Sequence, residues 1–193
     1  MCGRYQFSLK PSDQALRRLF TVIRQTYPDY EIPSGEVLPS QLVPVLVSGD
    51  TNARIVLMQW GYPGFHKSGL IINARRETAG EKAMFRDSLR LRRCVIPTTG
   101  YYEWSKTDGA RQKYYLHQAG KGLQYLAGLF DQYENQDRFV ILTAPANASV
   151  SDIHHRMPLI LQQNQVLAWL NDGEQAKTVL TQELPELERK LAE

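Results

Sequence analysis

The chain has few cysteines and no long apolar run, and each lack excludes a class of protein. No segment approaches the roughly 18 consecutive apolar residues that a membrane-spanning helix needs, and the opening MCGRYQFSLK lacks the apolar core of a signal peptide. Cys2 and Cys94 are the only cysteines, so we expect no structural disulfide. We therefore expect a soluble, cytoplasmic protein.

Two kinds of ligand site are also missing from the sequence pattern. The four histidines, at positions 66, 117, 154 and 155, and the two cysteines do not have the spacing of zinc ligands. Lys121 is followed by Gly122 rather than by Ser or Thr, and the earlier glycine of a Walker loop is absent. We therefore expect neither a metal nor a cofactor, and nucleotide hydrolysis has no support.

The charge balance is too mild to identify a partner. The chain has 23 Lys and Arg against 20 Asp and Glu, a formal net charge of +3. Arginines gather at positions 75–76 and 86–93, whereas the stretch after Asp172 is acid-rich. Composition alone favours an ordinary solvated surface.

The pattern of apolar residues predicts one α+β domain over residues 1–193. Leu16, Leu19, Phe20 and Ile23 have the spacing of an amphipathic helix. Further helices are expected over 81–90, 163–170 and 174–191, the last interrupted by Pro185. Strands are expected over 42–47, 54–60, 114–117, 123–129, 139–143 and 158–161, and a buried strand starts at Arg93. Because the helices do not alternate with the strands, we expect a mainly antiparallel, barrel-like sheet with peripheral helices.

Cys2 is the residue with the most distinctive chemistry. Cysteine is small enough that removal of Met1 is expected, which would place an α-amine and a thiol on one residue. The pKa of an α-amine is about 8, against about 10.4 for lysine, so an appreciable fraction is nucleophilic at physiological pH. The amine can condense with an aldehyde, and the thiol can then close a five-membered thiazolidine. The dipeptide alone favours a start codon that happens to precede Cys.

Three other segments offer polar side chains next to apolar ones. Asn73 opens a polar cluster directly after an apolar stretch, where a functional loop or an ordinary surface loop is expected. Glu103 stands among aromatic residues, which fits a general acid–base or a surface acid beside half-buried rings. His154 precedes Arg156 by two residues, which fits a proton-transfer and phosphate-contact pair or a solvated loop.

Taken together, the segments resemble the SRAP family of abasic-site processing proteins, and the matches occur in the same order along nearly the whole chain. They are Met1-Cys2-Gly3-Arg4, Trp60-Gly61 with Pro63, Asn73-Ala74-Arg75 with Glu77-Thr78, Arg93-Cys94 with Pro97, Tyr102-Glu103-Trp104, residues 143–147, and His154 with Arg156-Met157-Pro158. Three departures stand out. Residues 36–39 read Glu-Val-Leu-Pro where the family has Asn-Val-Ala-Pro, Phe65 stands where a second tryptophan is common, and the segment after Leu170 is short.

The resemblance implies a function and a role for each matching residue. Cys2 would attack the ring-opened sugar of an abasic site in single-stranded DNA and end as a thiazolidine crosslink. Asn73 and Glu103 would position the sugar and handle protons, and His154 would help to open the sugar. Arg4, Arg75, Arg86 and Arg156 would contact phosphates, and Trp60 and Phe65 would stack on bases. The family also implies autocatalytic loss of Met1, lyase activity, a monomer, and association with the nucleoid in a bacterium.

Two alternatives remain open from the sequence. An N-terminal-nucleophile amidase would use the thiol of Cys2 against a carbonyl carbon, with its own amine as base. A single-strand binding module would hold DNA through arginines and aromatic side chains without any chemistry.

Overall fold

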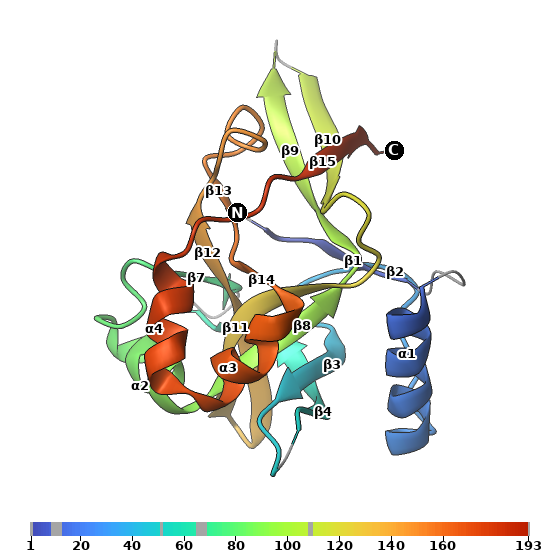
Figure 1. The fold of residues 1–193 in the computed structure, drawn as a ribbon, viewed down its shortest axis with the longest axis vertical. Helices are drawn as coiled ribbons and strands as arrows, with labels where there is room; N and C mark the ends of the chain where they lie inside the picture. Colours follow the sequence, from blue (N-terminus) through green and yellow to red (C-terminus); the bar gives the residue numbers. More distant parts are fainter. Residues whose placement is uncertain (1, 9–12, 51, 65–68, 108–109, 193) are drawn as a thin grey trace.

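The computed structural model describes residues 2–8, 13–50, 52–64, 69–107 and 110–192. Its centre is a ring of strands in which each strand pairs with the next, as Figure 1 shows. The ring consists of β12 (Gln136–Pro145), β4 (Arg54–Trp60), β3 (Leu42–Val47), β8 (Arg93–Thr98) and β11 (Gln124–Tyr133). The β11–β12 pair closes it, and only the β12–β4 pair within it is parallel. The expected α+β class with a barrel-like, mainly antiparallel sheet is confirmed.

Short strands extend this barrel near the candidate site. They are β7 (Asn73–Arg75), β13 (Arg156–Pro158) and β14 (Ile160–Leu161). β7 runs parallel to β12, and β13 runs antiparallel to it. Both strands that carry motif residues are therefore hydrogen-bonded to the same central strand. A separate pair joins β5 (Tyr62–Pro63) to β6 (Leu70–Ile71).

A second sheet provides the wall on which the candidate site is built. Its order is β15 (Glu188–Leu191), β10 (Ala110–His117), β9 (Gly100–Thr107), β1 (Tyr5–Phe7) and β2 (Gly35–Val37). All its pairs are antiparallel. The register places Gln6 opposite Glu36 and Trp104 opposite Lys113. Since directly opposed side chains point to the same face, the register decides which charges share a surface.

Helices cover the barrel on opposite sides, with α1 on one side and α2, α3 and α4 on the other (Figure 1). They are α1 (Gln14–Thr26), α2 (Ala83–Leu91), α3 (Val166–Asn171) and α4 (Gly173–Thr181), and a 3-10 turn (Gln163–Gln165) precedes α3. Asp13 caps α1 by accepting a 2.9 Å hydrogen bond from Leu16 N. None of the helices among the described residues is long and apolar enough to cross a bilayer.

The expected helix over residues 174–191 is wrong in its second half. α4 ends at Thr181, and the last four residues of the predicted range form β15. Pro185 cannot donate a helical hydrogen bond, and residues 188–191 instead pair with β10. A partner strand distant in sequence therefore overrides the local helical pattern.

Apolar side chains of the barrel form two buried clusters. Alternate residues of β3 and β12, such as Val45 and Ile141, pack with α1 and β1. Their neighbours Leu46 and Leu142 pack with α2, α3 and α4. The period-two alternation thus serves both faces of each strand. Cys94 is fully buried on β8, as the sequence predicts for a small apolar residue.

Candidate functional site

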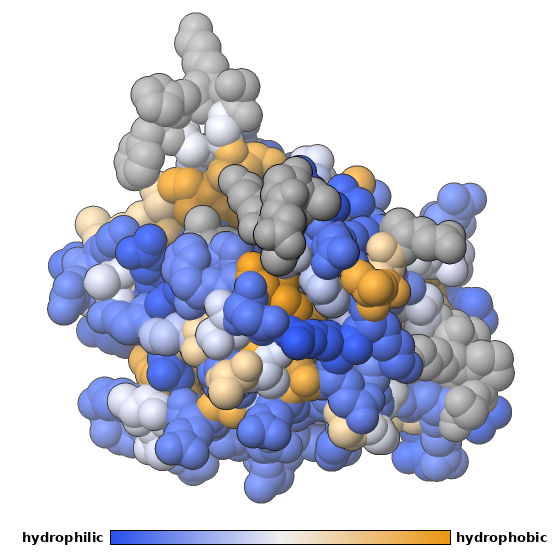
Figure 2. Space-filling model, turned by 90° about the horizontal axis from the view of Figure 1, so that it is seen from above, coloured by the Kyte–Doolittle hydropathy of each residue, from blue (hydrophilic) through white to orange (hydrophobic). Residues whose placement is uncertain are grey.

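A cleft of about 740 Å³ opens where the start of β1, the strands β9 and β10, and the loop before β13 meet. Gly3, Arg4, Glu103, Trp104, Arg111, Lys113 and His154 line it. In Figure 1 the N-terminal segment lies between β13 and the strands β9, β10 and β15. Viewed from above, this end of the molecule is mainly hydrophilic, with hydrophobic side chains in separate patches (Figure 2). The fold therefore brings segments distant in sequence to one polar opening.

Cys2 lies buried directly beside this cleft, next to its lining residue Gly3. The thiol is fully buried and donates to the backbone oxygen of Arg4 at 3.8 Å. Burial raises the pKa of the Cys2 thiol well above its usual range, and the nearby Glu103 carboxylate raises it further. The thiol is therefore protonated at neutral pH.

Glu103 connects Cys2 with the histidine of the cleft. Its side chain is only 4% exposed, although it lines the opening. The carboxylate raises the pKa of both the Cys2 thiol and the His154 imidazole, so it lies within electrostatic range of each. One buried carboxylate is thus the shared neighbour of a thiol and an imidazole.

His154 is held by the strand that follows it. Its Nδ1 lies 2.9 Å from the backbone N of Arg156 and 3.1 Å from the backbone O of the same residue. The N–H can donate to a neutral ring, and the carbonyl can accept from a protonated one, so Nδ1 has a partner in either state. Burial lowers the pKa of His154, against the opposing effect of Glu103, so the ring is mainly neutral at pH 7.

The outer wall of the cleft carries cations over an aromatic ring. The guanidinium carbons of Arg4 and Arg111 lie 5.1 and 5.0 Å from the centre of the Trp104 ring. Glu36 binds Arg4 Nη1 at 2.6 Å and Lys113 Nζ at 2.5 Å. Burial acts to raise the pKa of Glu36, but these hydrogen bonds outweigh it and hold the pKa below its usual value. This wall therefore carries three cations, and Glu36 pairs with two of them.

A family model described as "SOS response associated peptidase (SRAP)" matches residues 1–192. The chain belongs to the SRAP family. It is 33% identical over 183 residues to "Abasic site processing protein YoaM" of Bacillus subtilis, a match covering 89% of this chain and 79% of that protein. It is 30% identical over 177 residues to "Abasic site processing protein YedK" of Escherichia coli, covering 88% and 79%.

Solved structures share the fold of this SRAP chain. A crystal structure of a protein from Bacteroides thetaiotaomicron superposes with a TM-score of 0.79 at 22% identity, covering 100% of this chain and 92% of the other. A second, from Bordetella bronchiseptica, gives 0.79 at 23% identity and covers both chains fully. The architecture is thus retained at low sequence identity.

Four residues that the sequence predicts as functional meet at the cleft of the SRAP chain. Arg4, Glu103 and His154 line it, and Cys2 lies beside it. Asn73 is not among the lining residues, but both polar atoms of its amide are buried without a hydrogen-bond partner among the described residues. A buried amide in this state is suited to a polar ligand.

The base-stacking role expected for Trp60 is wrong. Its ring is fully buried, with the Tyr5 ring centre at 5.2 Å and the Phe139 ring centre at 6.2 Å. Its Nε1 donates to the backbone oxygen of Ile72 at 3.1 Å. Trp60 is a core residue of the SRAP chain and has no face to offer a base. Phe65, its expected partner, lies outside the described residues.

The structure does not support the phosphate contact expected for Arg156. The residue is 8% exposed, and Nη1 and Nη2 each donate to a carboxylate oxygen of Glu77 at 2.9 Å. Nη2 also donates to the backbone oxygen of Thr143 at 2.6 Å. These donors bind groups within the fold, so Arg156 fixes the end of the His154 loop.

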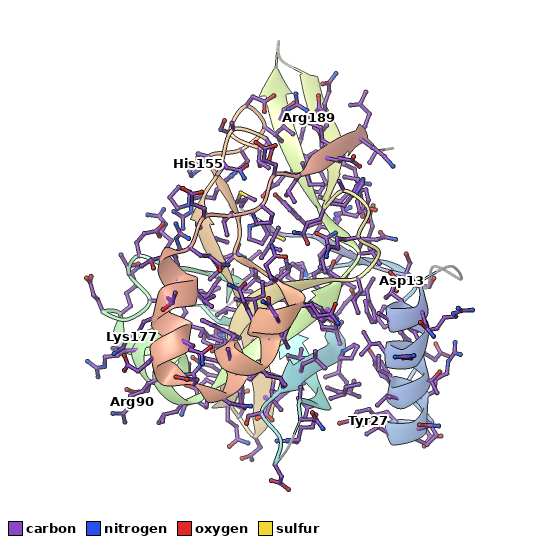
Figure 3. All side chains as sticks on the ribbon, in the orientation of Figure 1. Asp13, Tyr27, Arg90, His155, Lys177 and Arg189 are labelled. Atoms are coloured by element: carbon purple, nitrogen blue, oxygen red, sulfur yellow. The ribbon has the colours of Figure 1, made fainter. Side chains whose placement is uncertain are left out.

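The other two predicted arginines lie outside the cleft lining. Arg75 is exposed on β7, beside β12. Arg86 lines a different cavity, of about 350 Å³, together with Arg90 of α2 and Lys177 of α4. Figure 3 shows Arg90 and Lys177 at the α2–α4 end, away from His155 and Arg189. The structure therefore does not bring Arg86 to the candidate site.

Sequence reasoning missed three residues of the wall: Trp104, Arg111 and Lys113. Trp104 follows Glu103 in a matched motif, but the motif by itself indicates no separate role for its ring. The cations at 111 and 113 directly precede the predicted strand 114–117, and their spacing of two residues places them on one face of an extended chain. That spacing is the signal that could have found them.

Among the described residues, no group of three or more His, Cys, Asp or Glu side chains is placed to hold a metal ion.

Proposed function

We propose that this chain captures abasic sites in single-stranded DNA as a covalent crosslink through Cys2, once Met1 has been removed. The observation that carries the proposal is the meeting of Cys2, Glu103 and His154 at one basic cleft. The names of the relatives, "abasic site processing protein", support the same substrate. We further propose that the protein acts as a monomer and, in a bacterium, at the nucleoid.

The chemistry proceeds in two bond-forming steps. The neutral α-amine of Cys2 attacks the aldehyde carbon of the ring-opened sugar, a C–N bond forms, and loss of one water leaves an imine. The thiol then adds across the C=N bond, with sulfur bonding to carbon and its proton passing to nitrogen. The product is a five-membered thiazolidine, and the net change is the loss of one water.

The raised pKa of the Cys2 thiol favours this order of steps. A protonated thiol is a poor nucleophile, whereas an α-amine with a pKa of about 8 is partly neutral at physiological pH. The amine therefore reacts first, and the thiol reacts when the imine carbon is already close to it. The second step is then accelerated by the proximity of the thiol to the imine carbon and not by formation of a thiolate.

The neighbouring side chains take the proton-transfer and positioning roles. Glu103 accepts the proton that the amine loses and returns it to the departing oxygen. His154 transfers a proton to the sugar ring oxygen as the ring opens. Asn73 offers its buried amide to a sugar hydroxyl, and Arg4 and Arg75 contact phosphates.

Two further activities follow from the same groups. The imine acidifies the neighbouring C2′ proton, so its loss with departure of the 3′ phosphate gives lyase activity. The Cys2 thiol can also attack the carbonyl carbon of Met1, so that a C–S bond forms, the C–N bond breaks and the thiol proton passes to the Cys2 nitrogen; water then hydrolyses the thioester, which releases Met1 and restores the thiol. Both are part of the proposal and are tested by the products that they leave.

The test is incubation with a single-stranded oligonucleotide that carries one abasic site, followed by a denaturing gel and intact-mass measurement. We expect the mass of the chain without Met1 plus the oligonucleotide minus one water. An oligonucleotide with a tetrahydrofuran analogue, which has no aldehyde, is the matched control and leaves no covalent band. Retained affinity without a covalent product would instead identify a binding module, and amide hydrolysis without an adduct would identify an amidase.

A further inference from the structure

Glu36 bridges Arg4 and Lys113, two cations that line the cleft. Its two carboxylate oxygens bind separate cations, Oε2 with Arg4 Nη1 at 2.6 Å and Oε1 with Lys113 Nζ at 2.5 Å. The three side chains come from different parts of the sequence: the start of β1, β2 and β10. The two cations therefore converge on a single point that holds one bidentate anion.

The strand register places this point on an open face of the second sheet. Glu36 lies opposite Gln6 across β2 and β1, and Lys113 lies opposite Trp104 across β10 and β9. The side chains of the three charged residues are partly exposed, with 32% for Arg4, 29% for Glu36 and 17% for Lys113. An external anion can therefore reach the cations that Glu36 holds.

We infer that Arg4 and Lys113 form a subsite for a DNA phosphodiester, and that Glu36 fills this subsite in the free protein. A phosphodiester resembles the carboxylate in presenting two oxygens and one negative charge, so it can take the same two donors. Binding must displace Glu36. The inference rests on the proposed function, because the strand to be bound is single-stranded DNA.

Displacement makes Glu36 an internal competitor that weakens binding to every strand. Partly exposed ion pairs each contribute a modest amount, so removing the competing carboxylate should tighten binding by roughly 5- to 30-fold. Glu36 also neutralises part of the positive charge of Arg4 and Lys113, which would otherwise attract counterions. Without it, binding to a single strand should release about one more counterion, which makes the salt slope steeper by roughly 0.7.

The experiment measures the affinity of the full chain for an undamaged single-stranded oligonucleotide over a series of salt concentrations. Glu36→Gln should bind more tightly with a steeper slope, and Lys113→Met should bind more weakly while keeping the apolar stem of the lysine. The matched control is Glu174→Gln, which makes the same charge change in an exposed pair with Lys177 on α4. In the Lys113→Met background, the gain from Glu36→Gln should shrink.

Two outcomes would overturn the inference. One is equal tightening by Glu36→Gln and Glu174→Gln, which would mean that only net charge matters. The other is an undiminished gain in affinity from Glu36→Gln in the Lys113→Met background, because the carboxylate would then act independently of Lys113. Crosslinking to abasic DNA is scored separately. If no variant crosslinks, the proposed function fails, while the affinities still decide whether the subsite exists.

Discussion

His154 and His155 are adjacent in sequence, and we predict that only His154 contributes to crosslinking. His154 lines the cleft and lies within electrostatic range of Glu103, whereas His155 is exposed. The two rings stack with centres 4.4 Å apart, so both replacements remove the same ring contact. The comparison therefore isolates the position of the imidazole relative to the cleft.

The expected magnitude follows from the role of a positioned proton donor. Removing such a group slows a reaction by about 10² to 10⁴, which is about 2.7 to 5.4 kcal/mol of activation free energy. His154→Ala should show this loss in the single-turnover crosslinking rate. His155→Ala should stay within a few-fold of wild type, since His155 is not among the residues that line the cleft and its ring stacks on that of His154.

The pH dependence provides a second readout. Burial lowers the pKa of His154, so the protonated ring that donates to the sugar oxygen becomes scarcer as the pH rises. The neutral amine of Cys2 becomes more abundant over the same range, with a pKa of about 8. Wild type should therefore show a bell-shaped rate profile. His154→Ala should lose the alkaline decline and keep the rise that reports the amine.

The assay is single-turnover crosslinking at saturating protein with abasic single-stranded DNA, quenched over time at pH values from about 5 to 9, the range in which imidazole and α-amine titrate. Thermal unfolding of both variants shows that the compared proteins are folded. The reasoning is refuted if His155→Ala is slower than His154→Ala, or if the alkaline decline persists without His154.

Three other changes test the Cys2 thiol, the hydrogen bonds of Arg93 and the ion pair of Arg156 with Glu77. Cys2→Ser should leave at most a labile adduct, because an oxygen ring closes less favourably; a heat-stable band on a denaturing gel would contradict this. Arg93→Met should cost about 3 kcal/mol in urea unfolding, since Arg93 donates to the backbone oxygens of Trp169, Leu89 and Arg90 at 2.5 to 3.0 Å, and an unchanged midpoint would refute it. Burial acts to raise the pKa of Glu77, but the hydrogen bonds from Arg156 hold it below its ordinary value of 4.5. The stabilisation is therefore complete above that value and is lost as the pH falls through the lowered pKa, so Glu77→Gln should flatten the acid loss in urea midpoints.

Local patterns were sufficient where an element depends on its own residues. The strands at Leu42–Val47 and Arg54–Trp60 have the predicted bounds, because apolar runs between turn-forming residues mark both ends. The amphipathic spacing in α1 also predicted its buried face, with Leu16, Phe20 and Ile23 in the core. This reasoning failed for residues 188–191, because their strand exists only through pairing with β10.

For the candidate site, too, the sequence predicted some features and missed others. The order of motifs in the sequence pointed to Cys2, Glu103 and His154, and the structure brings these three to one cleft. The type of a side chain does not indicate its burial, so the sequence suggests a stacking surface at Trp60 although this residue packs in the core. Arg156 has the charge of a phosphate ligand, but Glu77 already binds it.

The sequence by itself determined the fold class and the family and predicted the reactive residue, because these depend on periodicity, ordered motifs and the chemistry of single side chains. Only the tertiary structure decided which charges meet. Glu36 is 32 residues from Arg4 and 77 residues from Lys113 in the sequence, and strand register alone places it within hydrogen-bonding distance of both. Whether a cation faces DNA or an internal carboxylate is a property of that register, and no local pattern encodes it.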